Sequence, residues 1–221
     1  AFGLELHLRL SLRDPSHPEK YLGNQELWSE AEKVLREVAA ENKTKYFEAP
    51  GEAAFYAPKL DFMAKDSLDR EWQVSTIQLD VNMPERFDLT CINEKGEKER
   101  IVMIHAAIMG SFERFMSIII EHTSGVFPTW LSPVQAIVLP ISEKHLEYGK
   151  GVCKKLIENG IRAEIDESNE TLGKKVRDAK MQKIPYLLVV GDKDVESKEI
   201  AVESRIEKLG SIPLDKFLNK I

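Results

Sequence analysis

The chain has 221 residues, of which 43% are hydrophobic and 31% charged, and its formal net charge is -6 at pH 7. These values predict a soluble globular protein of one or two domains, and without an apolar run of about 18 residues or a signal-peptide pattern we expect no membrane partner. Cys91 and Cys153 form no Cys-x-x-Cys pair, which argues against a disulfide scaffold or a zinc finger and predicts a reducing, cytoplasmic location.

The chain starts at Ala1 and enters a strand almost at once, from which we expect a fragment of a longer protein. Leucines alternate with polar residues from Leu4 to Leu12, a pattern that gives a strand one buried and one polar face. The polar face is either solvated or lines a site. A helix from about Asn24 to Glu41 follows, and its expected apolar side comprises Leu27, Ala31, Val34, Leu35 and Val38.

Two hairpins are predicted next. Strands at Leu60 to Lys65 and Glu71 to Asp80 flank a polar turn and should pair in antiparallel fashion. By pattern alone, their polar positions Gln73, Thr76 and Gln78 are exposed strand residues. The second hairpin is expected from Phe87 to Ile92 and from Arg100 to Ile104, and it leads the chain to His105, which by itself is more often hydrogen-bonded than metallated.

A helix is predicted to begin after Ser111, with Ser111 as its N-cap. Its expected apolar face comprises Phe112, Phe115, Met116, Ile119 and Ile120. Arg114 then lies in the first turn, where the helix dipole disfavours a cation, so we expect an anion to hold it. That anion is either a local carboxylate or a bound ligand.

The segment from His105 to Arg114, with the pattern His-x-Ala-Ile-x-Gly-Ser-x-Glu-Arg, resembles the third signature motif of class II aminoacyl-tRNA synthetases in the form that threonyl-tRNA synthetases use. The resemblance implies that Arg114 lies against the ATP phosphates, a role suited to a guanidinium. It also implies that His105 is one ligand of a zinc ion that selects threonine. The sequence departs from the family pattern at Ala106, where an arginine is usual.

The resemblance continues from Ala49 to Phe87, in a segment that lines the adenylate and threonine pocket of the family. It implies that Lys59 and Gln73 act with Arg114 in catalysis. The implied substrate and ATP contacts are Tyr56, Gln73, Thr76, Gln78, Ser111 and Arg114. Ala53 and Ala57 stand where the family prefers glycine, and a methyl group there is costly if either position needs a positive φ or a close ligand approach.

The residues from Gly125 to Pro133 are rich in Gly, Pro and Trp, which places a domain boundary near Ser132. We therefore assign 1-131 to the C-terminal part of a class II catalytic domain, an α+β antiparallel sheet with helices, and 132-221 to an α/β domain. The expected elements of the second domain alternate between strands and helices, as a mainly parallel sheet covered on both faces requires. They are strands at Val134 to Pro140, Ile161 to Ile165, Tyr186 to Val190 and Glu199 to Glu203, and helices at Glu143 to Asn159, Leu172 to Lys183 and Pro213 to Lys220.

This second domain resembles the anticodon-binding domain shared by threonyl, prolyl, histidyl and glycyl synthetases. A basic stripe is predicted on one helix, although such a charge run is often only a solvated helix face. Its members are Lys174, Lys175, Arg177, Lys180 and Lys183. The resemblance implies that Asn169, Arg177 and Asp194 contact anticodon bases, whereas Glu203 replaces a usual base-reading arginine.

The sequence therefore predicts part of a threonine–tRNA ligase, which would use ATP, Mg2+ and Zn2+, bind threonine and tRNA, and form a homodimer when intact. Two zinc ligands and two signature motifs of the family have no counterpart in the chain, so we expect the chain alone to be inactive. The alternative is a non-catalytic tRNA-binding paralogue or a disabled variant, which Ala53, Ala57 and Ala106 favour.

Overall fold

The structure is a computed structural model that describes residues 2–41, 45–205 and 208–221. Its internal contacts divide the chain into two compact units, Ala1–His122 and Thr123–Ile221. This division lies earlier in the chain than the domain boundary predicted from composition. Within the described residues, no helix is long and apolar enough to cross a membrane.

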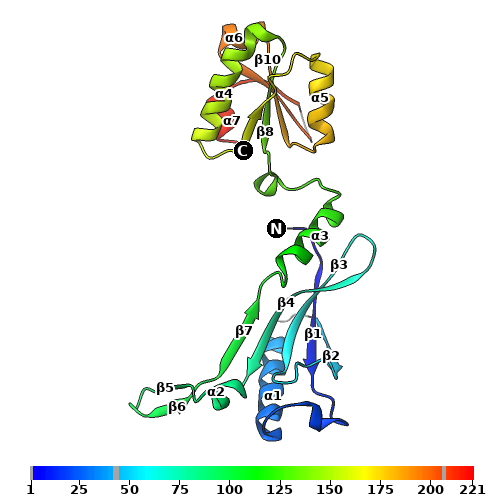
Figure 1. Ribbon diagram of the computed structural model, residues 1–221, viewed down its shortest axis with the longest axis vertical. Helices are drawn as coiled ribbons and strands as arrows, with labels where there is room; N and C mark the ends of the chain where they lie inside the picture. Colours follow the sequence, from blue (N-terminus) through cyan, green and yellow to red (C-terminus); the bar gives the residue numbers. More distant parts are fainter. Residues whose placement is uncertain (1, 42–44, 206–207) are drawn as a thin grey trace. The chain divides into compact units, whose positions relative to one another are not determined.

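The first unit is built on a sheet with the strand order β2-β1-β3-β4-β7 (Figure 1). Its strands are β1 (Leu6–Leu12), β2 (Tyr46–Pro50), β3 (Lys59–Lys65), β4 (Glu71–Asp80) and β7 (Met103–Ala107). β2 runs parallel to β1, and every other neighbouring pair is antiparallel. The predicted hairpin of β3 and β4 is thus confirmed, whereas β2 was not predicted from the sequence.

The helix α1 (Gln25–Glu41) covers one face of this sheet. Leu8, Leu10, Leu12 and Leu60 supply the sheet side of that core, and Leu35 and Ala39 supply the helix side. The buried residues of α1 are Trp28, Ala31, Glu32, Leu35 and Ala39. The predicted apolar side was therefore wrong at Val34 and Val38, which are exposed.

The second predicted hairpin is shorter than expected. A short helix, α2 (Met83–Arg86), precedes β5 (Thr90–Ile92) and β6 (Lys98–Arg100), which form a separate two-stranded sheet. The chain then continues into β7, which pairs with β4 instead of with the hairpin. That pairing sets Gln78 opposite His105 and so decides which side chains can meet.

The helix α3 (Phe112–Thr123) begins where the sequence predicts. Its buried residues are Phe115, Ile118 and Ile119, so the predicted apolar face was wrong at Phe112, Met116 and Ile120, which are exposed. Ser111 is the expected cap, because its hydroxyl accepts a hydrogen bond from the backbone N–H of Arg114 at 3.4 Å.

The second unit has a five-stranded sheet with the order β12-β11-β10-β8-β9. Three strands are parallel, namely β8 (Ala136–Pro140), β9 (Ala163–Ile165) and β10 (Tyr186–Val190). β11 (Glu199–Ser204) and β12 (Lys208–Pro213) extend the sheet in antiparallel fashion. The remaining helices are α4 (Leu146–Glu158), α5 (Leu172–Met181), α6 (Asp192–Ser197) and α7 (Leu214–Leu218).

Both faces of this second sheet are buried, as its continuous apolar strands predict. Val138, Leu188 and Val190 pack with residues of α4 and α7, whereas Ile137, Leu139 and Leu187 pack with residues of α5. Figure 1 shows α4 and α7 on one side of the sheet and α5 on the other. The α/β class was predicted correctly, although α6 and β12 were not.

Candidate functional site

The polar face of the first sheet gathers most of the predicted site residues. The register sets Arg9 of β1 opposite Asp61 of β3, and Asp61 opposite Thr76 of β4. One rung further along, Ser11, Lys59, Gln78 and His105 follow one another across four strands. Cross-strand partners share a face, so these side chains lie together on the side opposite the leucines that pack on α1.

Asp61 is the centre of this face. Its fully buried carboxylate accepts hydrogen bonds through Oδ2 from Ser11 Oγ at 2.7 Å, from Lys59 Nζ at 3.0 Å and from an Arg9 guanidinium nitrogen at 3.1 Å. Burial alone would raise the pKa of Asp61, but the hydrogen bonds from Ser11 and Lys59, together with the positive charge of Lys59, outweigh it and hold that pKa below its ordinary value. The charged carboxylate thereby fixes two cations on the face.

Arg9 links this centre to other predicted residues. A terminal nitrogen of its guanidinium lies 3.5 Å from Gln73 Oε1, and the other lies 3.4 Å from a carboxylate oxygen of Glu52. Sequence reasoning missed Arg9 and Asp61 as site residues. Arg9 belongs to the alternating first strand whose polar face could be solvated or line a site; its side chain is mostly shielded from water and bonded to Asp61, whereas a functional site on this face stays a prediction.

A second group of polar side chains surrounds His105. Its Nε2 lies 2.9 Å from Oδ2 of the buried Asp80. The Tyr56 ring packs edge-on against the imidazole with ring centres 5.7 Å apart, and the Tyr56 hydroxyl donates to Gln78 Oε1 at 2.5 Å. Tyr56, Gln78 and His105 were predicted separately, and the fold brings them into contact.

Arg114 lies exposed at the start of α3 and makes no ion pair with any described residue. A methyl group on the preceding Gly110 would lie 3.8 Å from the carbonyl oxygens of Gln73 and Val74, so the turn before α3 passes close to β4. Of the two anions that could hold Arg114, the local carboxylate is therefore not observed. The guanidinium is exposed and is therefore available to an external anion.

The three alanines that depart from the synthetase pattern cause no visible distortion. Ala53 and Ala57 both have negative φ angles, so the backbone conformation does not demand glycine at either position. Ala57 is fully buried, and the Ala53 N–H donates to Leu12 O at 3.1 Å. Ala106 follows His105 in β7 and so points to the opposite face of the sheet, away from the polar cluster.

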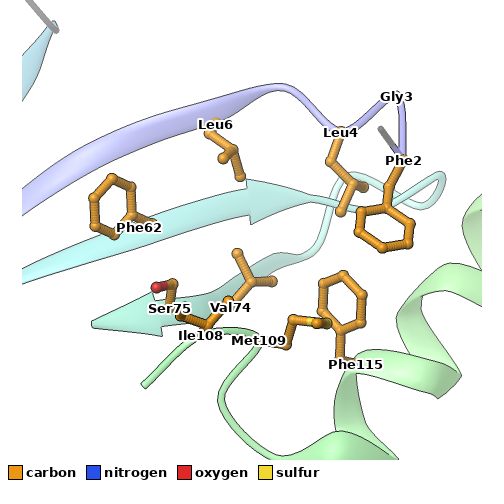
Figure 2. A pocket seen from close by; sticks show the side chains of 10 residues that line it. All are labelled: Phe2, Gly3, Leu4, Leu6, Phe62, Val74, Ser75, Ile108, Met109 and Phe115. Atoms are coloured by element: carbon orange, nitrogen blue, oxygen red, sulfur yellow. The ribbon is translucent and has the colours of Figure 1, made fainter. Parts of the chain in front are cut away.

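An apolar pocket of about 310 Å³ lies between residues of β1, β3 and β4 and the first turn of α3 (Figure 2). Phe2 and Phe115 meet edge-to-face at its mouth with ring centres 5.1 Å apart, and Leu6, Phe62 and Met109 are among the other lining residues. None of the predicted site residues lines this pocket, so it is separate from the polar face.

In the second unit the predicted basic stripe is only partly formed. Lys175 was placed wrongly, because its side chain is buried and its Nζ donates to the carbonyl oxygens of Pro140 and Asp166. Lys174 pairs with Glu170, which raises the Lys174 pKa, and Lys180 pairs with Glu203 at 2.7 Å. Arg177 is exposed and makes no ion pair with a described residue.

The predicted base contacts lie in different environments. Asn169 lines a pocket of about 210 Å³ at the carboxyl ends of β8 and β9, where open α/β sheets commonly bind ligands. Asp194 is buried, and its carboxylate accepts hydrogen bonds from Gly191 N at 2.9 Å and Ser211 Oγ at 3.2 Å. In this structure Asp194 therefore caps its own helix, and a base contact by Asp194 stays a prediction.

Comparisons with known proteins match both units of the chain to known families. Residues 17–123 match the model of the class II tRNA synthetase core domain for glycine, histidine, proline, serine and threonine, and residues 135–221 match that of the anticodon-binding domain. The chain belongs to the class II aminoacyl-tRNA synthetase family, in its threonyl branch. The predicted boundary at 131/132 falls in the segment between the two matched regions, and it stays a prediction.

Relatives within this family are similar along the whole chain. A threonine–tRNA ligase of Carboxydothermus hydrogenoformans is 49% identical over 221 residues, and one of Caldanaerobacter subterraneus is 50% identical over 221 residues. The chain spans about a third of these relatives, 34% in each case. A solved structure of the RNA-binding domain of threonyl-tRNA synthetase from Cryptosporidium parvum superimposes with a TM-score of 0.91 at 38% identity, covering 99% of this chain and 55% of that one.

Proposed function

We propose that this chain is the C-terminal part of a threonine–tRNA ligase. The complete enzyme would activate threonine with ATP, release pyrophosphate and transfer threonine to the 3′ end of tRNA. The observation that carries the proposal is the convergence of Lys59, Gln73, Thr76, Gln78 and His105 on one sheet face. The turn before α3, the helix that Ser111 caps and that carries Arg114 in its first turn, passes close to β4 of the same sheet.

The chemistry of that face suits adenylate formation. Arg114 would neutralise charge on the ATP phosphates, because its guanidinium has no competing carboxylate among the described residues. Lys59 is held by Asp61 at 3.0 Å and would contact the substrate together with Gln73. Mg2+ would bind with the ATP phosphates and not through a dedicated site of this chain. Positioning and electrostatic stabilisation are the main contributions to such a displacement.

Zinc would need ligands beyond this chain. No group of three or more His, Cys, Asp or Glu residues in the described ranges could hold a metal ion. His105 fits the requirement for one ligand, because one of its two ring nitrogens is bound by Asp80 and the ring is partly exposed. When bound, zinc would act as a Lewis acid that binds the amino and hydroxyl groups of threonine.

A chimaera tests catalysis. The corresponding segment of the Carboxydothermus hydrogenoformans ligase is replaced by this chain, and threonylation of tRNA is measured. We expect activity, and we expect Arg114→Ala to lower kcat/KM by about 100- to 1,000-fold, as loss of a charge-stabilising donor does. The control Arg36→Ala lies on α1 and pairs with Glu48, so it should have little effect. An inactive but folded chimaera would favour the alternative of a non-catalytic tRNA-binding paralogue.

The second unit would bind tRNA through the exposed side of α5. We expect tRNA affinity of this chain to fall steeply with salt, and the salt slope to decrease by about two units in Lys174→Ala/Arg177→Ala, one for each phosphate contact. The control Lys154→Ala/Lys155→Ala removes two exposed cations from α4, on the other face of the sheet. Equal affinity in the wild type and the α5 double variant would refute this surface.

Homodimer formation and a cytoplasmic location belong to the proposal for the complete enzyme. Class II catalytic domains pair as a rule, and the family's main pairing segment has no counterpart in this chain. Sedimentation of the 221-residue chain checks whether the chain pairs by itself, and we expect a monomer.

A further inference from the structure

We propose that Asp80 is a positioning residue that fixes the tautomer of His105, so that Nε2 carries the proton and the Nδ1 lone pair is the group His105 offers to a ligand. The identity of that ligand rests on the proposed function. The orientation of the ring does not, because contacts within the first unit determine it.

The carboxylate of Asp80 is itself held rigidly. Asp80 is the last residue of β4 and is fully buried. Its Oδ1 accepts hydrogen bonds from the backbone N–H groups of Asn82 and Met83, both at 2.9 Å, which locks the turn that leads into α2. Oδ2 is thereby directed at His105 Nε2, 2.9 Å away. Thr76, Gln78 and Asp80 alternate along β4, so Asp80 shares the polar face.

A second contact restrains the plane of the imidazole. The Tyr56 ring lies edge-on to it at an interplanar angle of 67°. Tyr56 is fixed at both ends, because its carbonyl oxygen accepts a hydrogen bond from Asn82 Nδ2 at 2.7 Å and its hydroxyl donates to Gln78. Asp80, Asn82, Tyr56 and His105 therefore form a closed circuit of contacts in which each group positions the next.

The contact with Asp80 determines which ring nitrogen of His105 carries the proton. A carboxylate only accepts hydrogen bonds, so the ring nitrogen that contacts Asp80 must be the donor. In a neutral imidazole the other nitrogen is then an acceptor with a free lone pair. Among the described residues, none is hydrogen-bonded to His105 Nδ1. An orienting carboxylate behind a histidine is the arrangement by which proteins prepare an imidazole to bind a cation or a proton donor.

His145 in the second unit provides an internal contrast. Its Nε2 also contacts a carboxylate, that of Asp192, at 3.1 Å. However, its Nδ1 accepts a hydrogen bond from the backbone N–H of Ser142 at 3.2 Å, and the ring is buried. Both nitrogens of His145 are used inside the fold, whereas His105 keeps one for a ligand and is 40% exposed at its side chain.

The test is an NMR measurement on the 221-residue chain labelled with ¹⁵N-histidine. Long-range proton–nitrogen correlations distinguish protonated from unprotonated ring nitrogens, and His105→Gln assigns the signals. We expect Nε2–H and a pyridine-type Nδ1 in the wild type. In Asp80→Asn the amide oxygen can still accept from Asn82 and Met83, but the amide nitrogen donates to Nε2. The proton should then move, so that Nδ1 shifts to the pyrrole-type range.

Asp192→Asn is the matched control, since it should shift the signals of His145 and leave those of His105 in place. A wild-type His105 with the proton on Nδ1 would overturn the proposal without any variant. An unchanged tautomer in a folded Asp80→Asn chain would overturn it as well. If the chimaera described above is inactive while the wild-type tautomer is as expected, the proposed function fails and the positioning role of Asp80 stands.

Discussion

Removing the carboxylate of Asp61 is the sharpest test of how the polar face is held together. Asp61→Ala leaves the Arg9 guanidinium and the Lys59 ammonium close together without their shared counter-ion. Their side chains are only 18% and 13% exposed, so water compensates little for the loss. Breaking a buried ion pair by removing one partner costs about 3–5 kcal/mol, and we expect a loss of that size in the free energy of unfolding.

The assay is urea unfolding followed by NMR signals of β3 and β4, because the two units need not unfold together. The control is Glu37→Ala, which removes an exposed partner of Lys33 on α1 and should leave the unfolding curve nearly unchanged. A loss below about 1 kcal/mol in Asp61→Ala would refute the reasoning, because it would mean that the two cations do not depend on this carboxylate.

The difference in unfolding free energy between the wild type and Asp61→Ala should depend on pH, because the pKa of Asp61 is lowered. A carboxyl group whose folded-state pKa is depressed stabilises the fold above its unfolded pKa, and this contribution is lost as pH falls through the folded pKa. The ordinary value for the group is 3.8, so the difference between wild type and Asp61→Ala should be fully present at pH 7 and shrink only in acid below that value. A difference that fades between pH 7 and pH 5 would point to another group.

Three further predictions concern other parts of the chain. Gly23→Ala should destabilise the first unit by about 2–4 kcal/mol in urea unfolding, because positive-φ strain adds to a steric clash. The new Cβ would lie 1.6 Å from Asn82 Oδ1. The control Gly96→Ala has a similar φ but open space around its Cβ, so it should show the strain alone. Asp66→Ala should speed amide hydrogen exchange at Leu68 and Arg70, since the Asp66 carboxylate accepts hydrogen bonds from both N–H groups; unchanged exchange would mean that the turn does not depend on these two bonds. The purified chain should not catalyse threonine-dependent pyrophosphate exchange, and robust exchange would show that the two signature motifs of the family without a counterpart in this chain are dispensable.

The structure explains why a glycine stands at position 23. Gly23 ends the string Glu-Lys-Tyr-Leu-Gly, and its φ of +82° together with the close approach of Asn82 requires a glycine. Asn82 in turn holds the carbonyl oxygen of Tyr56. Gly23 therefore leaves room for the Asn82 side chain, which holds Tyr56 beside His105.

The sequence by itself determined the elements with strong local signals. The β3–β4 hairpin, the start of α3 at a serine cap and the apolar strand β10 follow from alternation, capping and continuous burial, which depend on neighbours close in the chain. The class II pattern from His105 to Arg114 likewise identified the candidate site residues, because the resemblance lies in residue identity and spacing.

Only the tertiary structure decided which side chains meet. The buried sides of α1 and α3 differ from the predicted sides at Val34, Val38 and Phe112, because a helix with apolar residues on several sides is oriented by what packs against it. Lys175 does not belong to the basic stripe, because its buried ammonium group donates hydrogen bonds to the carbonyl oxygens of Pro140 and Asp166. Arg9 and Asp61 are 52 residues apart, and Asp80 and His105 are 25 apart, so strand register and not local sequence joins each pair.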